Sequence, residues 1–486
     1  MKHQYRIKVI VSGIIIMLHL SGCATYSKTS NLDALYSKTA SLYMLKRKQD
    51  KPTRNPVIVI PALLGSKLVD PETGTVVWGA FSGVYANPTT KTGARLAALP
   101  MQEGTSLKGL KDEVVPDGAL ARLNLNVLLM PVKLNTYYNI LRILGVGGYR
   151  DEDIGKAGTV KYPPGHFTSF QFDYDWRRDV VENAQRLDEF IKTTRRGIQD
   201  EIEKRFGIKD YDVNFDIVAH SMGGLVARYY LRYGALDLPE DGSLPKMTWA
   251  GTKHVKKLVM IGTPNSGSIS AFQALIEGYK NKPFVPNYSP AILGTMPSFY
   301  EIMPQRKNKA IVVNASGAEG EALDIYDPKL WEDMKWGLAS PKESKILKIL
   351  LPDIESPEER RKIAIDHQKK CLLRAKHLRE ALDVPGDPPK DISFDLFAGD
   401  AIPTDAVAGV NMENGSFKIM QKAPGDGTVL RSSALMDERV GGEWNPRLIS
   451  PIKWSHVMFI FSDHVGITQD PAFSDNILYY LLEHPE

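Results

Sequence analysis

Short apolar runs of strand length recur along the chain, separated by segments in which apolar residues have helical spacing. The runs are Pro56–Pro61, Ser169–Trp176, Val213–Ala219, Val255–Ile261, Ile392–Ala398 and Trp454–Phe461. Helical periodicity follows two of them, in Asp179–Phe206 and Gly223–Tyr233. Strands that alternate with helices are typical of a mostly parallel sheet covered on both faces, so the pattern predicts an α/β fold.

Two intervals between these runs, from position 61 to 169 and from 261 to 392, are too long for ordinary crossovers. Compact domains rarely hold structureless loops of such length, so we expect inserted subdomains. The predicted division is a first core segment, 55–267, with an insertion at about 79–165, then a helical cap insertion, 268–390, and a second core segment, 391–486. Within the cap, Ser356 and Glu359 predict a capping box for a helix that has Pro357 at its first position.

The N-terminus predicts export. Three basic residues precede an apolar run, Val9–Leu20, that is too short to span a bilayer as a helix and is typical of a secretory signal. The run ends in Leu-Ser-Gly-Cys, which resembles a bacterial lipobox. The resemblance implies that 1–22 is a lipoprotein signal peptide and that Cys23 becomes the lipid-modified first residue of the mature chain. The alternative is an ordinary signal with an incidental cysteine.

The residues around the cysteine extend this interpretation. Ala24 stands where an Asp would retain a lipoprotein in the inner membrane of a Gram-negative cell, so the resemblance implies an outer-membrane location. The polar segment 23–54 then suits a lipidated tether at the membrane surface. Without the signal, the formal net charge of +4 falls to about +1, which gives no argument for a nucleic-acid partner. Only Cys371 remains unlipidated, so an intramolecular disulfide is not expected.

A lone serine lies at the end of a predicted central strand, in the sequence Ala-His-Ser-Met-Gly-Gly. Open α/β sheets bind their ligands at such strand ends. A sharp strand-to-helix turn leaves room only for small residues two positions before and after the serine, and these are Ala219 and Gly223. The pattern is a nucleophile elbow with its first glycine replaced by alanine. It would expose Ser221 Oγ and aim the Met222 N–H at an oxyanion; the alternative is an incidental serine in the turn.

A serine nucleophile needs a histidine to take its proton and a carboxylate to orient that histidine. On α/β-hydrolase folds the chain order is Ser, then Asp or Glu, then His. Asp426, in a turn between two glycines, and His464, in the loop after the last predicted strand, fit this order. Asp400, which follows a predicted strand, is an alternative acid, and His456, within an apolar strand, is an alternative base. His220 should point away across the pleat, which suggests packing or support of the site.

Several segments together resemble the lecithin:cholesterol acyltransferase family, which includes lysosomal phospholipase A2, phospholipid:diacylglycerol acyltransferases and many bacterial esterases. They are NPVIVIPALLGSKL, FDYDWRR, AHSMGGLVARYYL, IGTPNSGS, TMPSFYEIMP, YDPKLWEDMKWG, GDGTV and DHVGI, between Asn55 and the C-terminus. The resemblance implies an α/β-hydrolase fold with Ser221 as nucleophile, Asp426 as acid and His464 as base. It also implies an oxyanion hole formed by the backbone N–H groups of Leu63 and Met222.

The chain departs from the family at two places. Leu63 stands where close animal relatives have an Asp, and Ala62 replaces the preceding Gly. Either change leaves a backbone donor but alters the pocket that would select the lipid or the acceptor. The paired cysteines that clamp a membrane-binding loop in the animal enzymes are absent.

The sequence as a whole therefore predicts a lipid-anchored serine hydrolase or O-acyltransferase, similar to a lipase or phospholipase A, that cleaves lipid acyl esters through an acyl-enzyme. No cofactor or nucleotide is expected, and the ten histidines show no metal-ligand spacing such as H-E-x-x-H. The alternatives are a small-ester or thioester hydrolase and a noncatalytic envelope lipoprotein that binds lipid. The apolar stretches Leu123–Leu134 and Ala291–Met303 either line an acyl pocket or form the cap's own core.

Overall fold

A computed structural model of the protein describes residues 54–79, 84–119, 122–127, 130–135, 137–162, 165–279, 286–314, 320–443 and 445–483. The predicted signal peptide 1–22, the lipidation site Cys23 and the tether up to residue 53 lie outside these residues. In the described part of the chain, no helix has the length and apolar character needed to cross a membrane.

A six-stranded parallel sheet, in the order β14-β11-β9-β8-β1-β7, forms the centre of the molecule. Its strands are β1 (Val57–Ile60), β7 (Ser169–Gln171), β8 (Phe215–His220), β9 (Val255–Ile261), β11 (Ser393–Gly399) and β14 (His456–Ile460). Each predicted apolar run overlaps one of these strands, so the predicted α/β class is confirmed. Strands β1 and β8 are buried along their whole length because layers of the protein cover both faces of the sheet.

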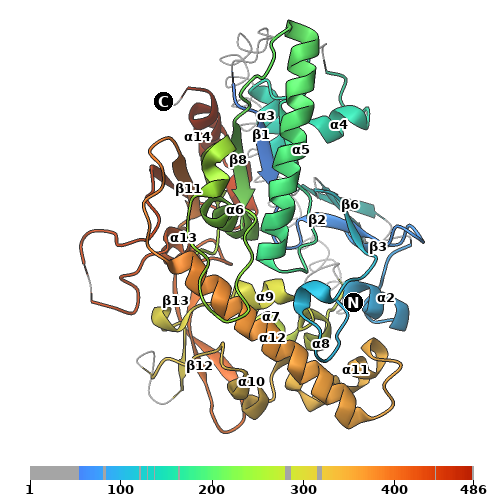
Figure 1. Ribbon diagram of the computed structural model, residues 1–486. Coiled ribbons are helices and arrows are strands. Elements are labelled where there is room, and N and C mark those ends of the chain that lie inside the picture. The colour runs from blue at the N-terminus through green and yellow to red at the C-terminus, as the bar shows by residue number, and fades with distance from the viewer. Residues whose placement is uncertain are drawn as a thin grey trace, which may run out of the picture.

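Helices cover this sheet (Figure 1), and the periodicity predicts two of them, in Asp179–Phe206 and Gly223–Tyr233. Helix α5 (Val180–Phe206) packs against α6 (Met222–Tyr233), and α3 (Tyr138–Val146) packs against the C-terminal helix α14 (Pro471–Leu482). Helix α5 begins where the Asp179 carboxylate accepts a hydrogen bond from Val181 N–H and ends at Gly207, whose φ of 68° suits a left-handed cap. Every residue of α6 is buried, so this helix forms part of the core.

The interval between β1 and β7 contains small antiparallel sheets and short helices. Its elements are β2 (Ser66–Val69), β3 (Val76–Trp78), α2 (Lys91–Ala97), η2 (Leu107–Gly109), β4 (Val115–Ala119), β5 (Arg122–Val127), β6 (Met130–Asn135), α3 and α4 (Glu152–Lys156). Strands β2, β3 and β4 form one sheet, and β5 pairs with β6. The side chains of the predicted pocket stretch Leu123–Leu134 lie outside the described part.

The interval between β9 and β11 is mainly helical. It contains α7 (Ile269–Glu277), α8 (Pro290–Leu293), α9 (Pro297–Glu301), β10 (Ile311–Val313), α10 (Pro328–Met334), α11 (Ser344–Leu350) and α12 (Pro357–Asp383). The stretch Ala291–Met303 is buried throughout, and most of its apolar side chains join the main hydrophobic core. Helix α12 begins as predicted at Ser356, whose Oγ accepts from Glu359 N–H at 3.2 Å. The Ser356 hydroxyl donates to the carboxylate of Glu358.

A smaller sheet links the helical interval to the C-terminal part of the chain. Strands β12 (Ile402–Val410) and β13 (Phe417–Gly425) are antiparallel, and β10 pairs with β12 in parallel. The sheet therefore crosses the predicted boundary between segments 268–390 and 391–486. The apolar pattern does not predict it, because most residues of β13 are at least partly exposed. Strand β13 ends directly before Asp426, which couples this sheet to the candidate site.

Candidate active site

Ser221 occupies a sharp turn between β8 and α6. Its backbone has φ 52° and ψ −123°, a conformation that residues with a side chain rarely adopt. Its N–H donates to Ile261 O at the end of β9 at 2.8 Å, and its carbonyl accepts from Gly224 N–H at 3.0 Å. These bonds hold the strained turn from both sides. The structure thus places Ser221 in the strand–turn–helix setting that its motif predicts.

Close packing requires glycine at both positions after Met222. A Cβ atom on Gly223 would lie 2.5 Å from Pro61 O at the end of β1. A Cβ atom on Gly224 would lie 2.1 Å from Thr263 Oγ1, in the segment after β9. Both distances are shorter than van der Waals contact, so any side chain here would push α6 away from the sheet.

Asp426 and His464 come together beyond the carboxyl ends of the strands. The Asp426 Oδ2 atom lies 2.7 Å from His464 Nδ1. Its Oδ1 atom accepts from the N–H groups of Thr428 and Val429 at 2.9 and 2.6 Å, and His464 N–H donates to Asp426 O at 3.0 Å. Asp426 is only 2% exposed, so these protein donors fix the direction in which its carboxylate faces the imidazole.

The pair shifts the pKa of both members. Burial alone raises the pKa of Asp426, but the attraction and hydrogen bond of His464, together with the backbone donors, outweigh it and hold the pKa below its usual value. Burial alone lowers the pKa of His464, but the charge and hydrogen bond of Asp426 outweigh it and raise the pKa. An ionised Asp426 therefore makes His464 a stronger base than an ordinary histidine.

This pair lies next to the serine turn. Gly262 follows the last residue of β9, to which Ser221 is hydrogen-bonded, and a Cβ atom on it would lie 3.1 Å from His464 Nδ1 and 3.2 Å from Asp426 Oδ2. The ring of His464 also lies near that of His220, with 4.9 Å between ring centroids. The Asp426–His464 pair therefore lies close to the serine turn, near the carboxyl ends of β8 and β9.

The loop between β1 and β2, Pro61–Gly65, lies beside the serine turn. It is tightly closed, because Gly65 N–H donates back to Ala62 O at 2.9 Å. Among the described residues, the N–H groups of Leu63 and Met222 have no hydrogen-bond partner. Both amides are therefore available to an oxygen atom of a bound ester, as the predicted oxyanion hole requires.

Four aromatic side chains hold this loop and the first residue of β2 through their polar atoms. Each of these side chains is buried. The bonds are Tyr174 Oη to Pro61 O at 2.8 Å, Ala62 N–H to Tyr137 Oη at 2.7 Å, Trp78 Nε1 to Leu64 O at 2.8 Å and Trp176 Nε1 to Ser66 O at 3.1 Å. These side chains come from three separate parts of the chain, namely Trp78, Tyr137 and the segment with Tyr174 and Trp176, so the loop is held by several elements.

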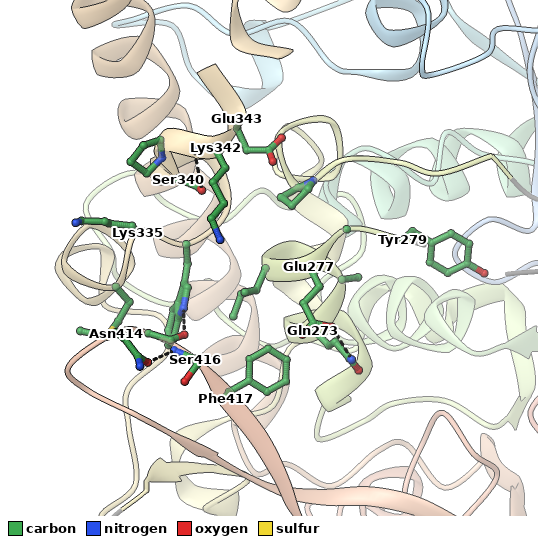
Figure 2. Close-up of a pocket in the computed structure, with 18 of the residues that line it drawn as sticks. Gln273, Glu277, Tyr279, Lys335, Ser340, Lys342, Glu343, Asn414, Ser416 and Phe417 are labelled. Carbon is green, nitrogen blue, oxygen red and sulfur yellow. Dashed lines mark hydrogen bonds between the residues drawn. The ribbon is translucent and has the colours of Figure 1, made fainter. Parts of the chain in front are cut away.

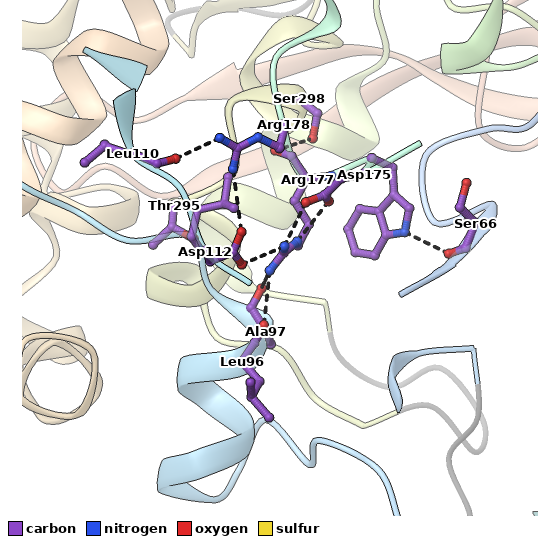
Figure 3. Close-up of polar contacts among 12 residues, drawn as sticks. Ser66, Leu96, Ala97, Leu110, Asp112, Asp175, Arg177, Arg178, Thr295 and Ser298 are labelled. Carbon is purple, nitrogen blue, oxygen red and sulfur yellow. Dashed lines mark hydrogen bonds and ion pairs between the residues drawn. The ribbon is translucent and has the colours of Figure 1, made fainter. Parts of the chain in front are cut away.

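The FDYDWRR segment connects this loop to the first insertion (Figure 3). Arg177 is fully buried, and its Nη2 atom lies 2.7 Å from both Asp175 Oδ2 and Asp112 Oδ2. Its Nη1 atom donates to the Leu96 carbonyl at 3.1 Å. A buried guanidinium needs such partners, because an unpaired buried charge is strongly destabilising. The adjacent Trp176 holds the loop before β2, so this segment has a structural role beside the active site.

The alternative acid and base have other partners. Asp400 forms an ion pair with Arg431, with 2.9 Å between Oδ1 and Nη1. His456 Nδ1 lies 2.8 Å from Asp395 Oδ1, across the first residues of β14 and β11. That end of the sheet is opposite to the end at which Ser221 lies. The geometry therefore favours Asp426 and His464 over these two residues.

A large cavity of the molecule lies away from the candidate triad residues. A cavity of about 980 Å³ lies between α7, the segment 334–343 and the start of β13, and Gln273, Glu277 and Phe417 line it (Figure 2). Ser221, Asp426 and His464 are not among its lining residues. No group of three or more His, Cys, Asp or Glu side chains in the described ranges is arranged to hold a metal ion.

Comparison with known families connects this geometry to a class of enzymes. Residues 162–336 match the family model described as lecithin:cholesterol acyltransferase. This stretch carries a lecithin:cholesterol acyltransferase family domain. The domain includes Ser221 and most of the helical cap, whereas Asp426 and His464 follow it. It supports an enzyme of the lipid esterase or acyltransferase class, as the resemblance of the sequence predicts. No curated protein matches the chain.

Solved structures support the fold. A chain of the crystal structure of the Tle4–Tli4 complex aligns over 88% of this chain and 98% of its own length, with 16% identity and a TM-score of 0.52. Bacillus licheniformis lipase BlEst2 in mature form aligns over 89% and 92%, with 12% identity and a TM-score of 0.32. EstA from Clostridium botulinum aligns over 88% and 87%, with 13% identity and a TM-score of 0.27. Of these three alignments, the first supports the fold. The sheet order, the serine turn and the family domain together identify an α/β-hydrolase fold.

Sequence analysis missed several residues that hold the site. Trp78 and Tyr137 lie in the first insertion and carry no motif, and Tyr137 meets Ala62 across 75 positions of the chain. Tyr174 and Trp176 lie in FDYDWRR, which resembles the family segment. The spacing of residues in the sequence does not predict their contacts with the loop after β1. The strongest available signal is the density of aromatic residues in that short segment.

Proposed function

We propose that this chain is a serine acyl-ester hydrolase or O-acyltransferase that acts on phospholipids or related lipids through an acyl-enzyme on Ser221. The observation that carries the proposal is the 2.7 Å bond between Asp426 and His464 beside the strained serine turn. Because Asp426 accepts a hydrogen bond from Nδ1–H, Nε2 is the unprotonated, basic nitrogen of the neutral His464 ring. It is therefore the atom that receives the Ser221 proton.

In the proposed reaction, Ser221 Oγ attacks the ester carbonyl carbon while its proton passes to His464 Nε2. The oxyanion accepts hydrogen bonds from the N–H groups of Leu63 and Met222, each contributing about 3 kcal/mol to transition-state stabilisation. Collapse breaks the bond to the leaving alcohol, which takes the proton from His464. A second acceptor, deprotonated by His464, then attacks the acyl carbonyl carbon, the bond to Ser221 Oγ breaks, and Ser221 regains its proton from His464. Water as the acceptor gives hydrolysis, and an alcohol gives acyl transfer.

Labelling with an active-site fluorophosphonate tests the nucleophile. We expect the full chain to be labelled and Ser221→Ala to remain unlabelled at the same stability. Fatty acid released from phospholipid vesicles and from a short-chain ester is then measured in parallel. Cleavage of the short ester alone would favour the small-ester hydrolase. Absence of labelling in both proteins would overturn the proposal and favour a lipid-binding lipoprotein.

We also propose that Cys23 carries a lipid that anchors the protein to the bacterial outer membrane. The lipobox resemblance at Leu20–Cys23 and the following Ala24 support this proposal. An anchor there would keep the enzyme near a lipid substrate. The test is incorporation of radiolabelled palmitate, followed by membrane fractionation, for the chain and for Cys23→Ser. Equal incorporation in both would remove Cys23 as the lipidated residue.

A further inference from the structure

A chain of hydrogen bonds behind the nucleophile joins the loop after β1 to the loop that bears His464. Ala62 N–H lies 2.7 Å from Tyr137 Oη, which lies 3.0 Å from His220 Nδ1. The other ring nitrogen, His220 Nε2, lies 3.0 Å from the backbone oxygen of His464. His220 directly precedes Ser221. The hydrogen-bond chain therefore reaches the predicted oxyanion donor, nucleophile and base from one side.

The two end groups fix every proton in this hydrogen-bond chain. An amide N–H such as that of Ala62 only donates, and a carbonyl such as that of His464 only accepts. Tyr137 Oη therefore accepts from the amide and donates its own proton to His220 Nδ1. His220 carries its remaining proton on Nε2 and donates it to the carbonyl. A single neutral tautomer of His220 satisfies all three bonds.

The surroundings keep this arrangement rigid. Tyr137 and His220 are 4% and 5% exposed, so water has little access to either. A Cβ atom on Gly65 would lie 2.7 Å from Tyr137 Oη, so only glycine lets the loop close over the hydroxyl. Burial, with a smaller effect of His464, lowers the pKa of His220 to about 3 and keeps its ring neutral at neutral pH. Loss of one member would therefore leave its neighbours buried and unpaired.

We propose that Tyr137 and His220 are positioning residues that hold the backbone at Ala62, directly before the predicted donor Leu63, and the backbone of His464 in one catalytic geometry. This inference rests on the proposed function, since it assigns the two residues to the same serine esterase site. Neither side chain is assigned a contact with substrate. A misplaced oxyanion donor or base reduces the stabilisation of the transition state more than that of the bound substrate. Loss of the Tyr137 or His220 side chain should therefore lower kcat rather than raise KM.

The decisive variant is Tyr137→Phe, which keeps the ring and removes the hydroxyl shared by Ala62 and His220. Tyr300→Phe is its matched control, because it also removes one buried hydroxyl bond, from Tyr300 Oη to Gly294 O at 3.0 Å in helix α9. We expect Tyr137→Phe to lower kcat by about 10- to 100-fold, with KM changed less than about threefold. The rate of fluorophosphonate labelling should fall by a similar factor, and the control should stay within about twofold of the unmodified chain.

A double variant tests whether the two residues act together. His220→Asn retains an acceptor near the Nδ1 position but loses the donor to His464 O. If both residues belong to one hydrogen-bond chain, Tyr137→Phe combined with His220→Asn should lower kcat by less than the product of the two single effects. Fully multiplicative effects would show two independent structural contributions and overturn the assignment.

Amide hydrogen exchange provides a readout that does not depend on turnover. We expect Tyr137→Phe to speed exchange in Pro61–Gly65 and in residues 462–466, and Tyr300→Phe to leave both segments unchanged. The inference is overturned if kcat of Tyr137→Phe stays within twofold of the unmodified chain, if only KM rises, or if exchange in both segments is unaltered. If the unmodified chain shows no labelling that depends on Ser221, the proposed function fails. The exchange data alone then decide whether these side chains hold the two loops.

Discussion

Replacing Gly223 with alanine tests whether backbone contact sets the distance between the serine turn and the loop after β1. The new Cβ atom would lie 2.5 Å from Pro61 O and 2.8 Å from Ile60 O. Real Cβ atoms essentially never approach a neighbour closer than 3.0 Å. The difference between 3.0 and 2.5 Å means that α6 and the end of β1 must separate by at least 0.5 Å.

No side chain can rotate away to relieve this clash. Both oxygens belong to the backbone, and Ile60 is 0% exposed within the central sheet. The separation therefore moves Ser221 relative to the Leu63 amide. A misplacement of about 1 Å can cost about 100-fold in rate, so we expect kcat/KM to fall by roughly 10- to 100-fold. Overpacking should also destabilise the fold by about 1–3 kcal/mol.

The assay is kcat/KM for a short-chain ester together with urea denaturation of the same preparation. Gly197→Ala, within α5, is the matched control because no heavy atom lies within 4 Å of its added Cβ. It should stabilise the protein by about 0.5–1 kcal/mol, as expected for alanine in place of a helical glycine, and leave kcat/KM unchanged. A Gly223→Ala protein with kcat/KM within about threefold of the unmodified chain would refute the steric reasoning.

Three further substitutions test the roles of single groups. Asp426→Asn should lower kcat by roughly 10³- to 10⁴-fold. It should also move the acid limb of the kcat/KM profile to lower pH, because the carboxylate raises the pKa of His464 and the base must be unprotonated to act. A pH–rate profile in which this limb does not move would contradict the role of Asp426. Arg177→Met should lower the free energy of unfolding by about 3–5 kcal/mol, because it leaves Asp175 buried without its partner. Urea denaturation measures this change, and a decrease below about 1 kcal/mol would contradict the buried-pair argument. Asp400→Asn should retain kcat in the ester assay, whereas a loss as large as that of Asp426→Asn would make Asp400 the acid.

The sequence was sufficient to predict features that depend on short-range rules. The central strands appear as continuous apolar runs because both of their faces are buried, as in β1 and β8. The serine turn could be predicted because its motif occupies five consecutive residues, although the contacts that require its glycines are with Pro61 and Thr263 elsewhere in the chain. Asp426 and His464 follow from chain order, from the turn between two glycines that holds Asp426 and from the loop after the last predicted strand that holds His464, so they could be proposed before their contact was visible.

Features that depend on distant contacts could not be predicted in this way. The bond from Ala62 to Tyr137 joins the loop after β1 to a residue 75 positions later, in the first insertion, and no periodicity connects these residues. For His220, the sequence predicts only a role in packing or in support of the site. Its partners, Tyr137 and the carbonyl of His464, reach it only through the tertiary fold. The sheet of β10, β12 and β13 was missed because its strands are short or partly exposed.

The strained backbone of Ser221 has a consequence for the stability of the whole protein. A residue with a side chain at φ 52° and ψ −123° costs on the order of 1–3 kcal/mol, and glycine relieves most of that strain. Ser221→Gly should therefore abolish the proposed activity and raise the melting temperature, and an unchanged or lower melting temperature would contradict this account. On the proposed function, the need for a reactive serine in this turn keeps the protein less heat-resistant than the same fold would be without it.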